Sequence, residues 1–260
     1  MLTNEQKQYF STFGFLVLPE LFTAQEADFI RRESERIFLK GRDGKPFDGK
    51  KRQCMIPFFE HSPELTRILE DDRIYSIGED LLGPDFVMEC TEGNLHVGDT
   101  QWHAGDPVPV GQLNIKVNFY LEPVTAETGA LRVIPGSHRP GFKERMEPLV
   151  ARHTDPNAMP FGVTGPDIPS FVLESQPGDV VVFPETIWHA AFGGSSGRIQ
   201  HAISFNTNTV TDEHVAWLRD FYNHAQPAWQ PCESLINSDR PRLRRLVARL
   251  VELGFDSLPY

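Results

Sequence analysis

The order of elements that the sequence predicts favours a mainly β fold, a β-sandwich or a jelly roll with helices packed outside it. Short strand patterns separated by turn residues run from Phe86 to Asn206, and helical patterns come before and after them. Residues 114–120 alternate strictly between polar and apolar side chains, which predicts a strand with one face in the core. The polar face carries Gln112, Asn114, Lys116, Asn118 and Tyr120, and the apolar face carries Leu113, Ile115, Val117, Phe119 and Leu121.

Two capping boxes predict the helices at the start of the chain. Thr3 with Gln6, and Thr23 with Glu26, have the spacing in which each side chain caps the other's backbone N–H. We therefore expect a short helix after Thr3 and a longer one from Thr23 to about Phe38.

The remaining elements follow from apolar runs and turn residues. Residues 15–18 are an apolar run of strand length, and residues 180–183 follow a Pro-Gly-Asp turn and are apolar enough to be buried on both faces. Residues 40–51 are rich in Gly and charge, which indicates a loop. Helices are predicted over 62–83, 212–224 and 238–253.

Composition limits the class of protein. A chain of 260 residues with 40% hydrophobic content can bury one substantial core, so we expect a single domain, 1–260, with a jelly-roll core at about 86–210. The net charge of -11 argues against binding to a nucleic-acid polymer, which requires a basic surface. The sequence shows neither a signal peptide nor an apolar run long enough to span a bilayer, so we expect a cytoplasmic protein with no membrane partner.

Two histidines far apart in the sequence, His103 and His189, are the candidate metal ligands. Fe(II) in mononuclear non-haem sites takes two imidazoles and a carboxylate on one face of an octahedron, and this leaves positions for a co-substrate and dioxygen. The carboxylate usually comes two residues after the first histidine. Here that place is Gly105, and the acid appears one residue later, as Asp106. Either a coordination position is open or a local bulge returns Asp106 to the metal.

A series of motifs follows in order along residues 10–210. They are Gly98-Asp99-Thr100-Gln101-Trp102-His103, residues 115–121, residues 127–138 (ETGALRVIPGSH), residues 178–183, Trp188-His189 and Arg198. With these motifs the chain resembles the phytanoyl-CoA dioxygenase family. The resemblance implies a double-stranded β-helix, the cupin-like jelly roll, with Fe(II), 2-oxoglutarate and O2 as cofactors. By position, His103 and His189 match the family's metal histidines.

The same resemblance implies a co-substrate site. Arg198 matches the arginine that holds the distal carboxylate of 2-oxoglutarate, and a guanidinium pairs with a carboxylate through two parallel hydrogen bonds. Gln101 and Thr128 resemble family positions near the co-substrate, so we expect them to donate hydrogen bonds to its metal-side carboxylate.

Gly105 decides between two reactions. In halogenating relatives Ala or Gly stands at this position, and chloride binds the iron where the carboxylate would be. We therefore expect a halogenase that chlorinates an unactivated carbon, with Gly105 leaving the halide position open. The alternative is a hydroxylase in which Asp106 is a displaced third ligand. A catalytically silent binding module on the same fold is a third possibility.

The substrate is predicted from weaker signals. Asn114 and Lys116 lie on the polar strand face, and Arg52 lies beside the charged loop, so together they would suit a phosphate or carboxylate on a free small molecule. Phe58, Phe59 and Trp102 would add a surface for stacking a planar ring. A further resemblance to nucleotide halogenases of nucleoside-antibiotic biosynthesis favours a nucleoside monophosphate. The sequence leaves the oligomeric state open.

Overall fold

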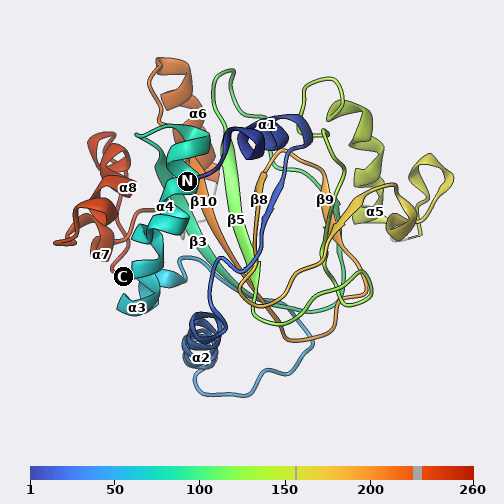
Figure 1. Ribbon diagram of the computed structural model, residues 1–260, viewed down its shortest axis with the longest axis horizontal. Coiled ribbons are helices and arrows are strands. Elements are labelled where there is room, and N and C mark those ends of the chain that lie inside the picture. The colour runs from blue at the N-terminus through green and yellow to red at the C-terminus, as the bar shows by residue number, and fades with distance from the viewer. Residues whose placement is uncertain (156, 225–229) are drawn as a thin grey trace.

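Two antiparallel sheets form the centre of the computed structural model, which describes residues 1–155, 157–224 and 230–260 (Figure 1). The larger sheet has the order β1-β8-β5-β10-β3-β2, and the smaller has the order β4-β9-β6-β7. Figure 1 shows α3, α4, α7 and α8 gathered beside β3 and β10, while α5 lies on the opposite side near β9. The predicted jelly roll with helices outside it is confirmed.

The strands and helices have the following bounds. The strands are β1 (Leu16–Leu18), β2 (Gln53–Met55), β3 (Val87–His96), β4 (Thr100–His103), β5 (Asn114–Tyr120), β6 (Leu131–Val133), β7 (Phe171–Leu173), β8 (Val180–Pro184), β9 (His189–Ala191) and β10 (Arg198–Asn206). The α-helices are α1 (Asn4–Phe13), α2 (Ala24–Gly41), α3 (Pro63–Thr66), α4 (Asp72–Leu82), α5 (Ala151–Thr154), α6 (Asp212–His224), α7 (Glu233–Ile236) and α8 (Pro241–Glu252).

Local sequence signals account for most of these boundaries. Both capping boxes are present, at Thr3 before α1 and at Thr23 before α2. The single helix predicted over 62–83 is wrong, because the segment breaks into α3, a 3₁₀ turn and α4. The break falls at Asp71, whose side chain caps α4 by accepting from Arg73 N at 2.9 Å.

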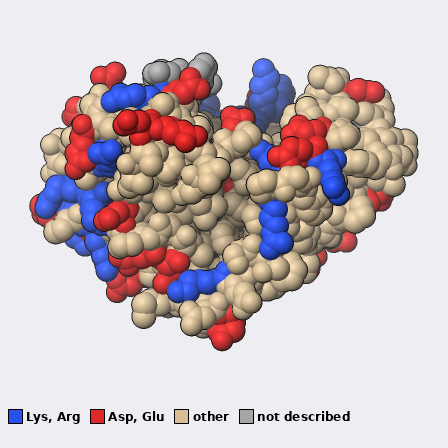
Figure 2. Space-filling model, turned by 90° about the horizontal axis from the view of Figure 1, so that it is seen from above, with Lys and Arg blue, Asp and Glu red and all other residues tan. Residues whose placement is uncertain are grey.

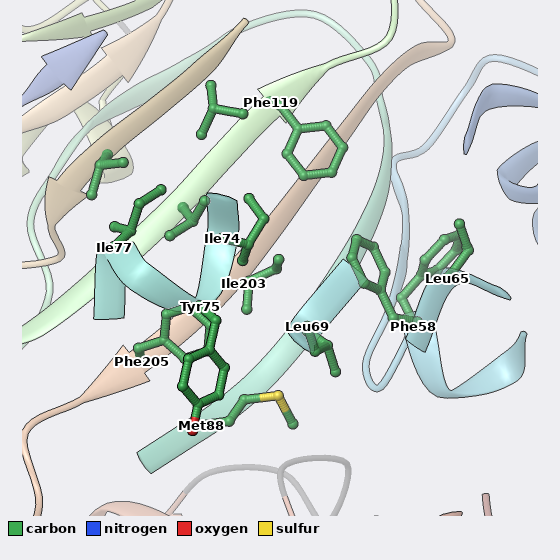
Figure 3. Close-up of a cluster of buried hydrophobic side chains, with 14 of the residues drawn as sticks. Phe58, Leu65, Leu69, Ile74, Tyr75, Ile77, Met88, Phe119, Ile203 and Phe205 are labelled. Atoms are coloured by element: carbon green, nitrogen blue, oxygen red, sulfur yellow. The ribbon is translucent and has the colours of Figure 1, made fainter. Parts of the chain in front are cut away.

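The main hydrophobic core lies between the helices and the outer face of the larger sheet (Figure 3). Ile74, Tyr75 and Ile77 of α4 pack there against residues of β5 and β10 such as Phe119 and Phe205. The alternation predicted for 114–120 therefore holds, with the apolar face of β5 beneath the helices and its polar face turned toward the smaller sheet.

The prediction of an aromatic surface that stacks on a planar ring of the substrate is wrong. Phe58 and Phe59 are completely buried in the main core, and Trp102 is completely buried in a separate cluster. The Trp102 indole N–H donates to Gly165 O at 2.8 Å, which fixes the ring in that cluster. None of the three rings is available to a ligand.

The surface agrees with the acidic composition. Figure 2 shows Lys and Arg interspersed with Asp and Glu on the face seen from above, without a broad basic area. Among the described residues, no helix combines the length and the apolar character needed to cross a membrane.

Candidate active site

His103 and His189 come together because β4 and β9 pair in antiparallel register. His103 ends β4, His189 begins β9, and the two residues are Cα partners across the ladder. Their ring centroids lie 4.0 Å apart. Residues in such direct cross-strand positions carry their side chains on the same face of the sheet, so both imidazoles face the same space.

Each imidazole is oriented by the carbonyl of the residue two positions before it in the chain. His103 Nδ1 lies 2.8 Å from Gln101 O, and His189 Nδ1 lies 2.8 Å from Ile187 O. A carbonyl only accepts, so the proton is assigned to Nδ1 and the lone pair to Nε2, as in imidazoles that bind metals. Burial lowers the pKa of both histidines, and for His189 the neighbouring His103 lowers it further. Both rings are therefore kept in the neutral form that coordinates a metal.

The two imidazoles open onto a cavity of about 90 Å³ between the sheets. Polar side chains of the larger sheet form its opposite wall. The lining residues are Arg52, Glu92, His96, Thr100, His103, Lys116, Asn118, Tyr120, Leu131, Phe183, His189, Ala190, Ala191, Arg198 and Gln200.

Arg198 brings an incompletely paired guanidinium into this cavity. It begins β10 and is 2% exposed, and its Nη1 donates to Thr128 O at 3.4 Å. Its Nε and Nη2 are buried and have no hydrogen-bond partner in the described part of the chain. Two free N–H groups on one edge of a guanidinium suit a carboxylate, so this arginine fits the distal end of 2-oxoglutarate.

Gly129 and Gly194 are site residues that the sequence reasoning missed. A Cβ atom added at either position would collide with Arg198 Nη1. The absence of side chains at both positions is what allows the guanidinium to lie where it does. The adjacent glycines Gly193 and Gly194, and the glycine that follows Thr128, were the sequence features that could have indicated a close approach of another group.

The segment after β4 is fixed by its backbone. Gly105 N donates to Glu185 O at 2.7 Å, and Lys143 Nζ donates to Gly105 O at 2.6 Å. A Cβ at Gly105 would lie 3.0 Å from both the carbonyl oxygen and the Cβ of Glu185, so close packing is a second reason for glycine here.

Asp106 is exposed, and the bulge that would turn it back toward the histidines is not seen. In the described part of the chain, no group of three or more His, Cys, Asp or Glu side chains is placed to hold a metal ion. The structure therefore brings His103 and His189 together but does not bring Asp106 to them.

Of the three candidate substrate residues, Lys116 and Arg52 line the cavity, whereas Asn114 does not. Lys116 Nζ lies 2.7 Å from Glu92 Oε1 and 3.8 Å from Glu185 Oε1. Burial acts to lower the pKa of Lys116, but these two carboxylates outweigh it and raise that pKa. Lys116 is thus a partly buried cation that is already paired with two carboxylates, and the expectation that it is free to bind an anion is corrected.

Arg52 is partly engaged. Its Nε and Nη2 donate to Asn94 Oδ1 at 2.9 and 2.5 Å, and Nη2 lies 4.0 Å from Glu92 Oε2. Its side chain is 45% exposed, so it retains donors at the edge of the cavity.

The chain matches the model of the family described as phytanoyl-CoA dioxygenase (PhyH) over residues 10–202, well over half of its length. It belongs to that family. This family member is an enzyme of the non-haem iron, 2-oxoglutarate-dependent dioxygenase class, and the resemblance stated from its motifs is confirmed at that level.

Its relatives are distant. An uncharacterized protein of Mycobacterium tuberculosis (strain ATCC 25618 / H37Rv) is 25% identical over 78% of this chain and 73% of its own length. The ectoine dioxygenase of Stutzerimonas stutzeri (strain A1501) is 25% identical over 53% of this chain and 51% of its own length, so the match spans about half of that protein.

Solved structures share the fold. HygX from Streptomyces hygroscopicus, with nickel and 2-oxoglutarate bound, has a TM-score of 0.62 at 21% identity, covering 82% of this chain and 90% of that one. EctD from S. alaskensis, with iron bound, has a TM-score of 0.58 at 22% identity, covering 79% and 77%.

Two residues expected from the family resemblance lie away from the cavity. Thr128 Oγ1 accepts from Thr125 N at 2.7 Å within an exposed turn. Gln101 Oε1 accepts from Arg152 Nε at 2.9 Å. Both residues contribute instead through their carbonyl oxygens, which position Arg198 and His103 respectively.

Proposed function

We propose that the protein is an iron- and 2-oxoglutarate-dependent halogenase that replaces a hydrogen on an unactivated carbon with chlorine. The observation that carries this proposal is the contrast between Gly105 and Asp106. Glycine stands two residues after His103, where a third ligand would be, and the neighbouring carboxylate is exposed. A ferrous ion held by two neutral imidazoles has one negative ligand fewer than usual, and chloride would restore that charge.

The other residues have defined tasks in this proposal. His103 and His189 would hold the iron through Nε2, and Arg198 would bind the distal carboxylate of 2-oxoglutarate through Nε and Nη2. Iron, 2-oxoglutarate and dioxygen together supply the oxidant that removes hydrogen from carbon. Glu185 and Lys143 hold the Gly105 backbone between them, and Gly105 lacks the side chain that would compete with a halide.

For the substrate we retain a free nucleoside monophosphate. Its phosphate would lie at the edge of the cavity near Arg52, which keeps unpaired donors there, rather than at Lys116. The acidic exterior does not oppose this, because a local cation acts on a small anion over a distance of only about 10 Å at moderate salt.

A hydroxylase is the second candidate, and the names of the relatives favour it. One of the relatives given above is an ectoine dioxygenase, and none of those named is described as a halogenase. In a hydroxylase with this arrangement, water or hydroxide would occupy the position that chloride takes in the first proposal.

Product analysis separates the two candidates. The protein is loaded anaerobically with Fe(II) and 2-oxoglutarate, a panel of nucleoside monophosphates is added, and oxygen is admitted with chloride, with bromide or without halide. We expect a product with the isotope pattern of the halide supplied. A hydroxylated product that forms equally well without halide would reject halogenation and support the second candidate.

Variants of Gly105 refine this test. Gly105→Asp should abolish halogenation and permit hydroxylation if the new carboxylate reaches the metal. Gly105→Ala is the matched control, because it meets the same close contact with Glu185 but adds no ligand.

A further inference from the structure

A second group of buried polar side chains lies beyond Lys116 on the cavity side of the larger sheet. Asn114 and Asn206 are Cα partners across β5 and β10, and both are buried. Asn206 Nδ2 donates to Oε2 of the buried Glu89 at 2.7 Å. Strand alternation turns Asn114 to the same side of the sheet as Lys116; Lys116 lines the cavity, and Asn114 lies just beyond its lining. These three residues, Glu89, Asn114 and Asn206, are called the acceptor group below.

The acceptor group contains oxygens without partners. Oδ1 of Asn114, Oδ1 of Asn206 and Oε1 of Glu89 are buried, and none has a hydrogen-bond partner in the described part of the chain. Gln112 Oε1, just before β5, and Asn208 Oδ1, just after β10, are also buried and have no hydrogen-bond partner among the described residues. Leaving a buried polar atom unpaired costs about 1 to 3 kcal/mol, so such a concentration calls for a ligand. Amide oxygens accept, so the missing partner of the two asparagines is a donor, and the Glu89 carboxyl accepts through both of its oxygens only when it is ionised.

The backbone places the acceptor group on the Gly105 side of the histidines. Glu185 N donates to Asn114 O at 3.3 Å, and Gly105 N donates to Glu185 O at 2.7 Å. Arg198 begins β10, whereas Asn206 ends it, so the two lie at opposite ends of this strand. The acceptor group is therefore remote from the guanidinium that suits the co-substrate and close to the position where the proposed function puts the halide.

We propose that Glu89, Asn114 and Asn206 recognise an amino or amidine group of the substrate, a nitrogen that carries two or more hydrogens. The inference rests on the proposed function, because it assigns one end of the substrate of that reaction. A phosphate or carboxylate would add acceptors beside the oxygens already there and would face the carboxylate of Glu185. The anionic end of the substrate therefore lies elsewhere, toward Arg52.

Without a ligand the surroundings of Glu89 favour its neutral form, so its role as an acceptor requires a bound group that favours ionisation. Burial raises the pKa of Glu89 well above its usual range, and the nearby Glu185 carboxylate adds to the shift. A bound ammonium or amidinium would favour the ionised carboxylate and offset this effect. Tyr222 of α6 donates to Glu89 O at 3.3 Å, which ties this part of β3 to the helix.

Two nucleotides that differ along one edge of the base test the proposal. Adenosine 5′-monophosphate carries an amino group where inosine 5′-monophosphate carries an oxo group, and the ring nitrogen beside it carries one hydrogen in the inosine nucleotide and none in the adenosine nucleotide. Binding of each is measured by calorimetry on protein loaded with Fe(II) and 2-oxoglutarate without oxygen. We expect the adenosine nucleotide to bind about tenfold more tightly, as one well-placed hydrogen bond allows. Equal affinities would overturn the proposal.

Variants locate the effect. Asn114→Leu and Asn206→Leu should each weaken binding of the adenosine nucleotide by about tenfold and change binding of the inosine nucleotide by less than about twofold. Asn237→Leu, at an exposed position just after α7, is the matched control and should alter neither affinity. If both nucleotides lose affinity equally in the two Leu variants, the amino group is not what these residues recognise.

Small ligands that are not nucleotides test the amine site independently of the proposed nucleotide substrate. Benzylamine and benzyl alcohol are titrated separately into the same loaded protein, made with a diamagnetic metal, while side-chain amide signals of Asn114 and Asn206 are followed by NMR. We expect shifts with benzylamine and none with the alcohol. If neither nucleotide binds but benzylamine shifts these signals, the nucleotide is rejected and the amine site stands. Absence of shifts with both fragments would overturn the amine site.

Discussion

His103 and His189 are direct cross-strand partners, and each ring turns its Nδ1 toward the carbonyl two residues earlier in the chain. Strand pairing therefore sets the distance between the two imidazoles, and backbone carbonyls set their orientation. No other side chain is needed to present both Nε2 atoms to the cavity. The metal site is thus organised by the sheet, before any ion binds.

Arg198→Lys should weaken binding of 2-oxoglutarate by about 10- to 100-fold, because an ammonium keeps the charge but cannot form two parallel hydrogen bonds. Calorimetry on the protein loaded with Mn(II) measures this directly. Arg36→Lys, on the surface of α2, is the control. Unchanged affinity in the Arg198 variant would mean that this guanidinium does not hold the co-substrate.

Asp106→Ala should leave iron binding and turnover within about twofold of the original, because the carboxylate is exposed and, among the described residues, forms no metal-binding group with the two histidines. Iron content after gel filtration and the initial rate check this. His189→Ala should lose iron under the same conditions and calibrates the assay. Loss of iron in the Asp106 variant would support the hydroxylase with a displaced ligand.

Much of the fold could be predicted because its signals are local. Capping boxes fix the starts of α1 and α2, and strict alternation identifies β5 and its two faces. The broken helix over 62–83 could not be predicted from periodicity alone. Asp71 has a side chain that competes for backbone N–H groups, and the same residue type is also tolerated on helix surfaces.

The site was predicted less completely, for a physical reason. His103, His189 and Arg198 lie in motifs that can be identified from sequence. The pairing of Lys116 with Glu92 depends on β5 and β3 both lying beside β10, which is a long-range relationship. The roles of Gln101 and Thr128 depend on which of their oxygens reaches the site, and residue type does not decide between side chain and backbone.

Lys116→Met should lower the free energy of unfolding by about 3 kcal/mol, the lower end of the range for a broken buried pair, because the buried Glu92 carboxylate keeps only the more distant Arg52 guanidinium, 4.0 Å away. Urea unfolding followed by circular dichroism measures the change. Lys51→Met, in the exposed loop before β2, is the control, and its free energy of unfolding should stay within about 0.5 kcal/mol of the original. A Lys116 variant that keeps full stability and loses only substrate affinity would instead make this lysine an anion ligand.

Glu60→Gln should change how stability depends on pH. Burial raises the pKa of Glu60 from 4.5 to about 7, although a hydrogen bond with Thr91 opposes the shift. Between these values the folded protein holds a proton that the unfolded chain releases, so stability falls as pH rises from about 4.5 through 7. Glutamine does not titrate, so the variant does not lose stability in this way. Its free energy of unfolding should exceed that of the original by up to about 3 kcal/mol at pH 8.

Urea unfolding at pH 5 and pH 8 checks this prediction, with Glu64→Gln on the exposed surface of α3 as the control. The free energies of unfolding of the Glu60 variant and the original should be closest to each other at pH 5. Parallel stability profiles for the two proteins across this range would contradict the assignment of a buried, protonated Glu60.

The most direct test of the central claim is an anaerobic crystal structure with Fe(II), 2-oxoglutarate and bromide, whose anomalous scattering identifies the halide. We predict iron bound to His103 and His189, with a bromide peak bonded to the iron on the Gly105 side. Iron bonded to the Asp106 carboxylate, with no bromide beside it, would contradict the claim.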